Sequence, residues 1–173
     1  TFSNAAFSQW QAIFKDSAHF QFNAVYFLNN DTGFVGGYDF TSFTNNGIIL
    51  RTTDGGQSWD TTKLPDIVIC FSFINESFGV SGGDGGSNFL TTDAGSTWSQ
   101  RNNGSVMSDH SSIYFLNPTL GYRSTMQNWI QKTIDTGITW QNVYNSTGGS
   151  FFPGTSKMVF PNSQVGYLAQ SRF

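Results

Sequence analysis

Short runs of apolar residues alternate with polar turn segments along the chain. Four of these runs share one pattern: an apolar stretch ending in phenylalanine, an Asn-containing polar segment, and a glycine followed by valine or an aromatic residue. Runs of this length, bounded by turn residues and lacking helical spacing, predict β-strands. The shared phenylalanines, called here the column phenylalanines, are Phe27, Phe73, Phe115 and Phe160.

The column phenylalanines are 46, 42 and 45 residues apart. A period in the forties with several short strands per unit is typical of a propeller blade. In the first full unit we expect strands at about 24–29, 33–38, 47–53 and 58–63. The sequence therefore predicts an all-β fold, a β-propeller of four-stranded antiparallel blades, with helix almost absent.

The repeat divides residues 1–173 into consecutive parts of a single propeller domain or segment. Trp10 precedes Phe27 by the same 17 residues that separate Trp98 from Phe115, which predicts a closing strand of a preceding blade near Trp10. Closed propellers generally need four or more blades, and an open array leaves exposed strand edges, so we expect a segment of a larger propeller. The predicted parts are a closing strand (1–19), three blades (20–66, 67–105 and 106–149) and a partial blade (150–173).

A second repeat lies inside the first. The stretches "RTTDGGQSW", "LTTDAGSTW" and "KTIDTGITW" each place an aspartate directly after the third strand and a glycine two positions later. The glycine supplies the positive φ of a tight turn, the carboxylate and hydroxyls hydrogen-bond within the hairpin, and the tryptophan covers it. We interpret all of these residues as structural: Thr52, Asp54, Gly56, Ser58, Trp59, Thr91, Asp93, Gly95, Thr97, Trp98, Thr133, Asp135, Gly137, Thr139 and Trp140.

These three stretches resemble the Asp-box, or BNR repeat, at every defining position. With "VYFLNNDTGFVGG" upstream, the unit is most similar to the repeats of the photosystem II stability/assembly-factor-like propellers, and more distantly to sortilin-type and sialidase propellers. The resemblance implies that the boxes lie at turns between the third and fourth strands, away from the usual binding surface. A catalytic interpretation is poor, because three identical carboxylates stand on three blades without a second carboxylate nearby in sequence.

Composition narrows the functional classes. Charged residues make up only 11% of the chain and the net charge is −3, so there is no basic stripe for nucleic acid. A surface of Asn, Ser, Thr, Gln and Gly suits an extracellular, cell-surface or periplasmic protein, although no signal peptide is present in this sequence. Cys70 is expected to be a small buried hydrophobe, and no apolar run is long enough for a membrane span.

Candidate ligand contacts fall in the loops opposite the boxes. Exposed aromatic residues there suit stacking on a sugar or packing on a protein, and polar residues suit orienting a ligand. The alternative for each residue is a loop side chain tucked against its neighbour. The candidates are Tyr38, Phe43, Asp84, His110, Phe151 and Phe152. We expect no metal and no cofactor, because neither histidine has cysteine or acidic partners at ligand spacing.

Three functions fit this pattern to different degrees. The first is a non-enzymatic recognition or scaffolding propeller that binds a protein or a glycan. Its partners would also include further blades, from the same longer chain or from another subunit. The second is a structural segment of a large surface or adhesive protein. The third, a sialidase-like hydrolase, lacks a recognisable arginine cluster and Tyr/Glu pair, because the only glutamate is Glu76.

Overall fold

The structure is a computed structural model that describes residues 19–41, 46–101, 110–125, 127, 129–145 and 156–170. The predicted closing strand near Trp10 therefore lies outside the described residues. The first sheet is antiparallel and runs in chain order. It contains β1 (Phe20–Phe27), β2 (Gly33–Asp39), β3 (Asn46–Thr52) and β4 (Asp60–Leu64).

Two more sheets repeat this order, and a two-stranded sheet follows them. The second contains β5 (Val68–Phe73), β6 (Gly79–Gly83), β7 (Asn88–Thr91) and β8 (Ser99–Arg101). The third contains β9 (His110–Phe115), β10 (Gly121–Thr125), β11 (Trp129–Thr133) and β12 (Gln141–Asn145). The last pairs β13 (Ser156–Val159) with β14 (Tyr167–Gln170). The described residues hold one 3₁₀ turn, η1 (Asp84–Gly86), and no α-helix, so the all-β prediction is confirmed.

The strands of the first sheet start and end close to their predicted positions, except at β1. This strand begins at Phe20 and ends at Phe27, a shift of about four residues at its start. A bulge between Phe22 and Ala24 lets the pairing with β2 continue past the predicted start. The strand ends early because the N–H of Leu28 donates to the carbonyl of Thr32 and closes the turn.

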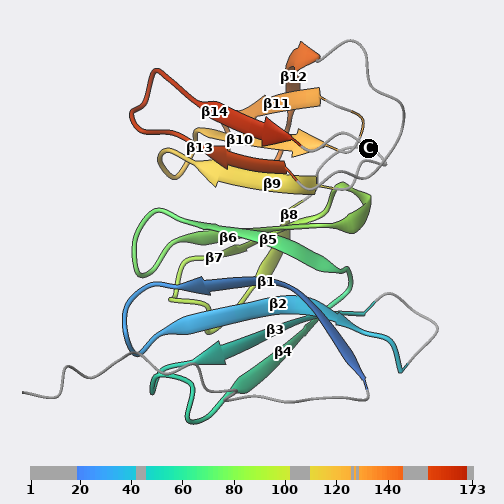
Figure 1. Ribbon diagram of the computed structural model, residues 1–173, viewed down its shortest axis with the longest axis vertical. Coiled ribbons are helices and arrows are strands. Elements are labelled where there is room, and N and C mark those ends of the chain that lie inside the picture. The colour runs from blue at the N-terminus through green and yellow to red at the C-terminus, as the bar shows by residue number, and fades with distance from the viewer. Residues whose placement is uncertain are drawn as a thin grey trace, which may run out of the picture.

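The sheets stack so that their first strands, β1, β5, β9 and β13, lie next to one another in chain order (Figure 1). The turns from β1 to β2, from β3 to β4 and their counterparts lie at the left of that view. The η1 turn between β6 and β7 lies at the right. We call the left side the turn end and the right side the loop end, and each four-stranded sheet a blade.

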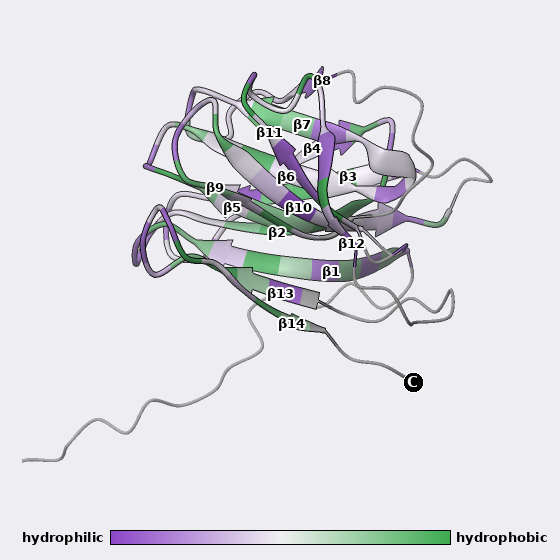
Figure 2. Cartoon of the chain, turned by 90° about the horizontal axis from the view of Figure 1, so that it is seen from above, coloured by the Kyte–Doolittle hydropathy of each residue, from purple (hydrophilic) through white to green (hydrophobic). Residues whose placement is uncertain are grey.

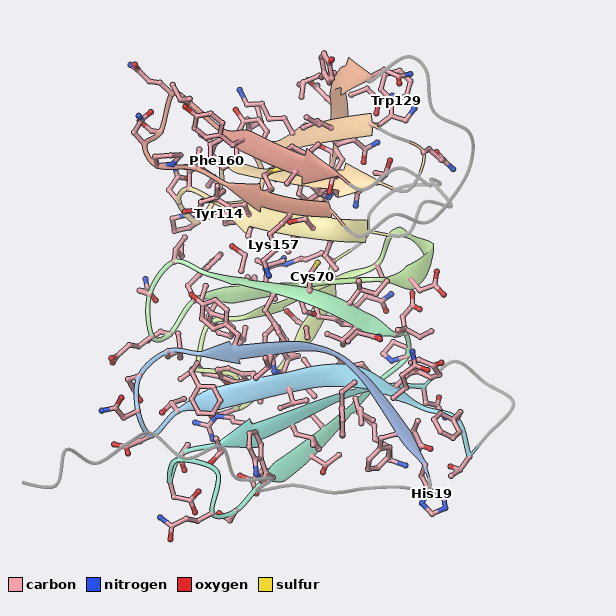
Figure 3. All side chains as sticks on the ribbon, in the orientation of Figure 1. His19, Cys70, Tyr114, Trp129, Lys157 and Phe160 are labelled. Carbon is pink, nitrogen blue, oxygen red and sulfur yellow. The ribbon has the colours of Figure 1, made fainter. Side chains whose placement is uncertain are left out.

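Apolar side chains fill the seams between consecutive blades. The seam between blades 1 and 2 buries Phe34, Ile49, Leu64, Val68 and Phe89. The seam between blades 2 and 3 buries Val80, Leu90, Ile113 and Phe115. At the last seam, Phe160 lies 5.1 Å from Tyr114 between ring centroids, and Figure 3 shows the two rings side by side. Among the described residues, each seam therefore joins a blade to its neighbour in the chain.

The column phenylalanine of each blade packs against the glycine that begins the second strand of the same blade. Phe27 is paired with Gly33 and Phe73 with Gly79 across the first two strands. A Cβ built on Gly33 would stand 2.6 Å from the Phe27 ring, and one on Gly79 would stand 2.3 Å from the Phe73 ring. Only glycine leaves room for the ring, which explains why phenylalanine and glycine recur together.

Hydropathy follows this architecture. In Figure 2 the outermost strands β4, β8 and β12 are largely hydrophilic, whereas hydrophobic stretches lie on the inner strands. Strands β6 and β7 are buried along their whole length, because blade 2 has a packed seam on each side. The outermost strands β4 and β8 are mostly exposed. In the part of the chain that the structure describes, no helix has the length and apolar character needed to cross a membrane.

Candidate functional site

Three hairpins at the turn end carry the repeated aspartate pattern, and each is organised around one threonine and one aspartate. We call these hairpins, residues 52–59, 91–98 and 133–140, the aspartate turns. In the first, the Thr52 hydroxyl donates to Asp54 Oδ1 at 2.8 Å and accepts from the N–H of Gly56 at 2.8 Å. Asp54 also accepts from the N–H and the hydroxyl of Ser58, at 2.9 and 2.6 Å. The same bonds recur in the other two turns.

These hydrogen bonds hold the carboxylates in their charged form. The Ser58 hydroxyl and N–H lower the pKa of Asp54 to about 2, and Thr97 does the same for the pKa of Asp93. Burial raises the pKa of Asp135, but the bonds from Thr139 outweigh that effect and the pKa is lowered. A carboxylate that stays ionised and already accepts several hydrogen bonds is poorly suited to proton transfer near neutral pH.

The backbone of the aspartate turns is tighter than the sequence predicted. The glycine two positions after each aspartate has a positive φ, as at Gly137 with 79°. The residue directly after the aspartate also has one, with φ of 57° at Ala94 and 64° at Thr136. This second positive φ directs the N–H of Thr136 to the carbonyl of Thr119, which lies in the adjacent turn of the same blade. The sequence had predicted only one such residue per turn.

The second and third aspartate turns also bond to the preceding blade, whereas we had expected their bonds to stay within one hairpin. Arg51 of blade 1 donates from Nε to the carbonyl of Ala94 at 2.8 Å. Asn88 of blade 2 donates from Nδ2 to the carbonyl of Gly137 at 3.1 Å. Trp98 of the second turn also packs edge-on against Phe34 of blade 1. The second and third aspartate turns thus each join two consecutive blades.

The loop end carries the two ligand candidates whose side chains the structure describes. Tyr38 lies near the end of β2 and is partly exposed, and its hydroxyl donates to Gln21 Oε1 at 2.8 Å. Asp84 opens η1 on the next blade and is partly exposed. Phe43, Phe151 and Phe152 lie outside the described residues, and His110 begins β9 with a side chain outside that set.

Backbone bonds fix η1 against the connection between β4 and β5. The N–H of Asp84 donates to the carbonyl of Ile67 at 3.3 Å, and the N–H of Gly83 donates to the carbonyl of Ser87 at 2.9 Å. The Ser87 hydroxyl donates to Asp66, which also accepts from the N–H of Ile67. Asp84 is therefore presented on a short turn with a fixed backbone.

A buried arginine supports η1 from the neighbouring blade. Arg123 on β10 has no exposed surface, and it donates from Nη1 to the carbonyl of Gly86 at 3.3 Å. Its Nε donates to Gln131 Oε1 at 2.6 Å, and its guanidinium carbon lies 4.4 Å from the Trp140 ring centroid. Burial lowers the pKa of Arg123 to about 9. Its Nη2 has no hydrogen-bond partner among the described residues.

Sequence reasoning missed Arg123, although a signal was present. The residue two positions after the glycine is Val35 in blade 1 and Ser81 in blade 2, but Arg123 in blade 3. A charged residue at a buried strand position is uncommon unless it is bonded inside the protein. Arg51 binds at the turn end and Arg123 reaches η1 at the loop end, so these two arginines serve different contacts.

The described side chains do not support a metal-binding site. Within the described ranges, no group of three or more His, Cys, Asp or Glu side chains is placed to hold a metal ion. Glu76 is exposed in the turn between β5 and β6, at the turn end. Cys70 is partly buried against the seam between blades 2 and 3, and burial raises the pKa of its thiol to about 12.

Comparison with solved structures identifies the architecture. A structure described as YCF48 bound to D1 peptide matches with a TM-score of 0.67 and 23% identity, over 83% of this chain and 46% of that one. YCF48 from Cyanidioschyzon merolae matches with a TM-score of 0.55 and 20% identity, over 72% of this chain and 40% of that one. The fold is a β-propeller. The prediction of a propeller with three complete blades and a partial one is thereby confirmed.

The same comparisons set the extent of the likeness. The chain spans about half the length of the YCF48 structures that it matches. No protein-family model matches it, and no curated protein matches it. At this level of identity the likeness establishes the propeller fold, and the function has to be inferred from the surface.

Proposed function

We propose that this chain is a non-enzymatic propeller that recognises a protein segment through its loop end. The observation that carries the proposal is the difference between the aspartates at the two ends of the molecule. At the turn end, the aspartates are occupied by hydrogen bonds that build the fold. At the loop end, Asp84, whose Oδ1 accepts from the N–H of Gly85, lies on a turn bonded to the β4–β5 connection through Ile67 and to blade 3 through Arg123. Rigid presentation lowers the entropic cost of binding a partner.

The structural neighbour supports a protein as the partner. One matching YCF48 structure has a D1 peptide bound, and this chain shares its fold. Partly exposed Tyr38 and Asp84 on adjacent blades offer an aromatic surface and a hydrogen-bond acceptor, a combination suited to an extended peptide. We also propose that the aspartate turns are Asp-boxes and that their role is structural.

The proposed location is outside the cytoplasm, on the grounds of the low content of charged residues. Charged residues form 11% of the chain, well below the usual quarter of a globular protein. Fractionation of the producing cells tests this part separately, since recovery of the protein in the cytoplasmic fraction would contradict it.

A peptide-binding experiment tests the proposed function. Random peptides displayed on phage are selected against the folded chain, and the best binder is titrated by calorimetry. We expect Tyr38→Ala and Asp84→Asn each to weaken binding by roughly tenfold, because truncating a central contact costs more than about 1 kcal/mol. Glu76→Gln, which removes the same charge at the turn end, should change the affinity less than about twofold.

Two results would contradict this proposal. The first is equal weakening by Glu76→Gln and Asp84→Asn, which would move the binding surface to the turn end. The second is the absence of enriched peptides while immobilised sugars retain the protein, which would favour a glycan-binding propeller.

A further inference from the structure

The turn end of blade 3 carries apolar side chains where blades 1 and 2 carry polar ones. Ile134 precedes the aspartate of the third aspartate turn and Ile138 follows its glycine, and the two side chains are 68% and 45% exposed. The residues at these positions in the first two aspartate turns are Thr53, Gln57, Thr92 and Ser96. All four are also exposed, although each of their blades is followed by another packed blade. The exposure of the isoleucines therefore follows from their place in the turn.

The turn between β9 and β10 shows the same difference. Pro118 is exposed there, one residue after the asparagine whose side chain closes the turn. The residue at this position is Asn30 in blade 1 and Glu76 in blade 2, and both are exposed. A backbone bond from the N–H of Thr136 to the carbonyl of Thr119 joins this turn to the third aspartate turn. We call the surface of Pro118, Ile134 and Ile138 the blade 3 patch.

The fold does not require isoleucine at either position. All three aspartate turns make the same hydrogen bonds to the aspartate, whichever residues occupy the two exposed positions. Neither isoleucine belongs to the apolar clusters that fill the described seams. Single apolar residues on a surface are common, but three that gather on two bonded turns indicate an interaction surface.

Carboxylates border the blade 3 patch. Asp135 lies between the two isoleucines in the sequence, and Glu76 and Asp93 are exposed on the turns of the neighbouring blade 2. Hydrogen bonds from Thr97 lower the pKa of Asp93 to about 2, so this carboxylate stays charged at neutral pH. Lys132, at the end of β11, is partly buried, and these carboxylates outnumber it. An apolar patch with a negative border is complementary to an apolar pocket with a positive border, and it is repelled by an anionic lipid surface.

We propose that the blade 3 patch docks into an apolar pocket of a partner protein and that basic side chains border this pocket. The two isoleucines would fill the pocket, and lysine or arginine side chains of the partner would pair with the carboxylates around the patch. Apolar contacts at the centre of an interface supply most of its affinity, whereas charges at its rim chiefly raise the association rate. This surface lies at the turn end, so it is separate from the peptide site proposed at the loop end.

Selection of binders from a library of folded domains tests this proposal. The probe is a phage-displayed three-helix domain with one randomised face, and the bait is the Tyr38→Ala/Asp84→Asn chain, in which the proposed loop-end site is impaired. We expect the enriched domains to carry apolar residues together with lysine or arginine. Ile134→Thr/Ile138→Ser, which copies the second aspartate turn, should weaken their binding by roughly tenfold or more. Val143→Thr, at a side chain that is 51% exposed on β12, should change the affinity less than about twofold.

A second variant and the salt dependence complete the test. Pro118→Ser, which places the residue of the partial blade in this turn, should weaken binding by roughly threefold. Raising the salt concentration from about 50 to about 500 mM should weaken binding severalfold, because salt screens the charges at the rim. Circular dichroism checks that each variant is folded.

Several results would overturn the proposal. They are a selection that enriches no domain, enriched domains that are acidic, and folded Ile134→Thr/Ile138→Ser protein that binds as tightly as the bait. Binding of the bait to phosphatidylcholine vesicles that the double substitution abolishes would overturn it in favour of a lipid surface. None of these results bears on the peptide site, because the bait carries that site in an impaired form.

Discussion

At residue scale, Thr136 stands in a backbone conformation that its side chain disfavours. Its φ is 64°, a region that costs a non-glycine residue roughly 1–2 kcal/mol. The first aspartate turn has Gly55 at the same position. We expect Thr136→Gly to raise the free energy of unfolding by roughly 0.5–1 kcal/mol, since glycine's greater freedom when unfolded offsets part of the gain.

Urea denaturation of the parent chain and two variants measures this effect. Thr136→Ala removes the β-branch but keeps the left-handed strain, so it should stabilise less than Thr136→Gly. The bond from the Thr136 N–H to the carbonyl of Thr119 involves only the backbone and persists in both variants. A destabilised glycine variant would mean that the threonine side chain makes a favourable contact that outweighs the strain.

Residue spacing predicted the aspartate turns and their location but not every contact they make. The threonine, aspartate and glycine recur at fixed positions, and their hydrogen bonds span at most four residues, so local sequence determines them. The bond from Arg51 to Ala94 joins residues 43 apart. Arg123 and Gly86 are also far apart in the chain. Such contacts depend on how blades stack, which spacing along one strand does not encode.

At the scale of elements, the paired phenylalanine and glycine set how closely the first two strands approach the seam. A Cβ on Gly79 would meet the Phe73 ring at 2.3 Å, and that ring is held by its stacking on Phe34. We expect Gly79→Ala to lower the free energy of unfolding by about 1–3 kcal/mol, the usual cost of overpacking.

A double-mutant cycle identifies the cause of that loss. Phe73→Leu removes the ring that the new methyl group would strike, so the double variant should lose less than the two single variants added together. The coupling is read from chemical denaturation of the four proteins. Strict additivity would show that Gly79 is required for its backbone conformation rather than for the space its missing side chain leaves.

At the scale of the whole molecule, the described blades form a linear series in which each packs against its neighbours along the chain. Period and strand count were predictable from the sequence, because each blade repeats the same local pattern. The predicted start of β1 was wrong, because a bulge at Phe22 and Ala24 extends the pairing in a way that alternation does not reveal. The burial of Arg123 also depends on two blades at once.

Linear stacking predicts a gradient of stability along the chain. Blade 2 has a packed apolar seam on both sides, whereas in the described part of the chain β14 is an edge strand of a two-stranded sheet. In a linear series of repeats, the free energy of unfolding is approximately the sum of contributions from each unit and from each interface between units. An end unit shares fewer interfaces, so its local unfolding costs less free energy. Amide hydrogen exchange of the dilute chain should be slowest in β6 and fastest in β14. Amides of β14 that are as protected as those of β6 would contradict the linear series itself.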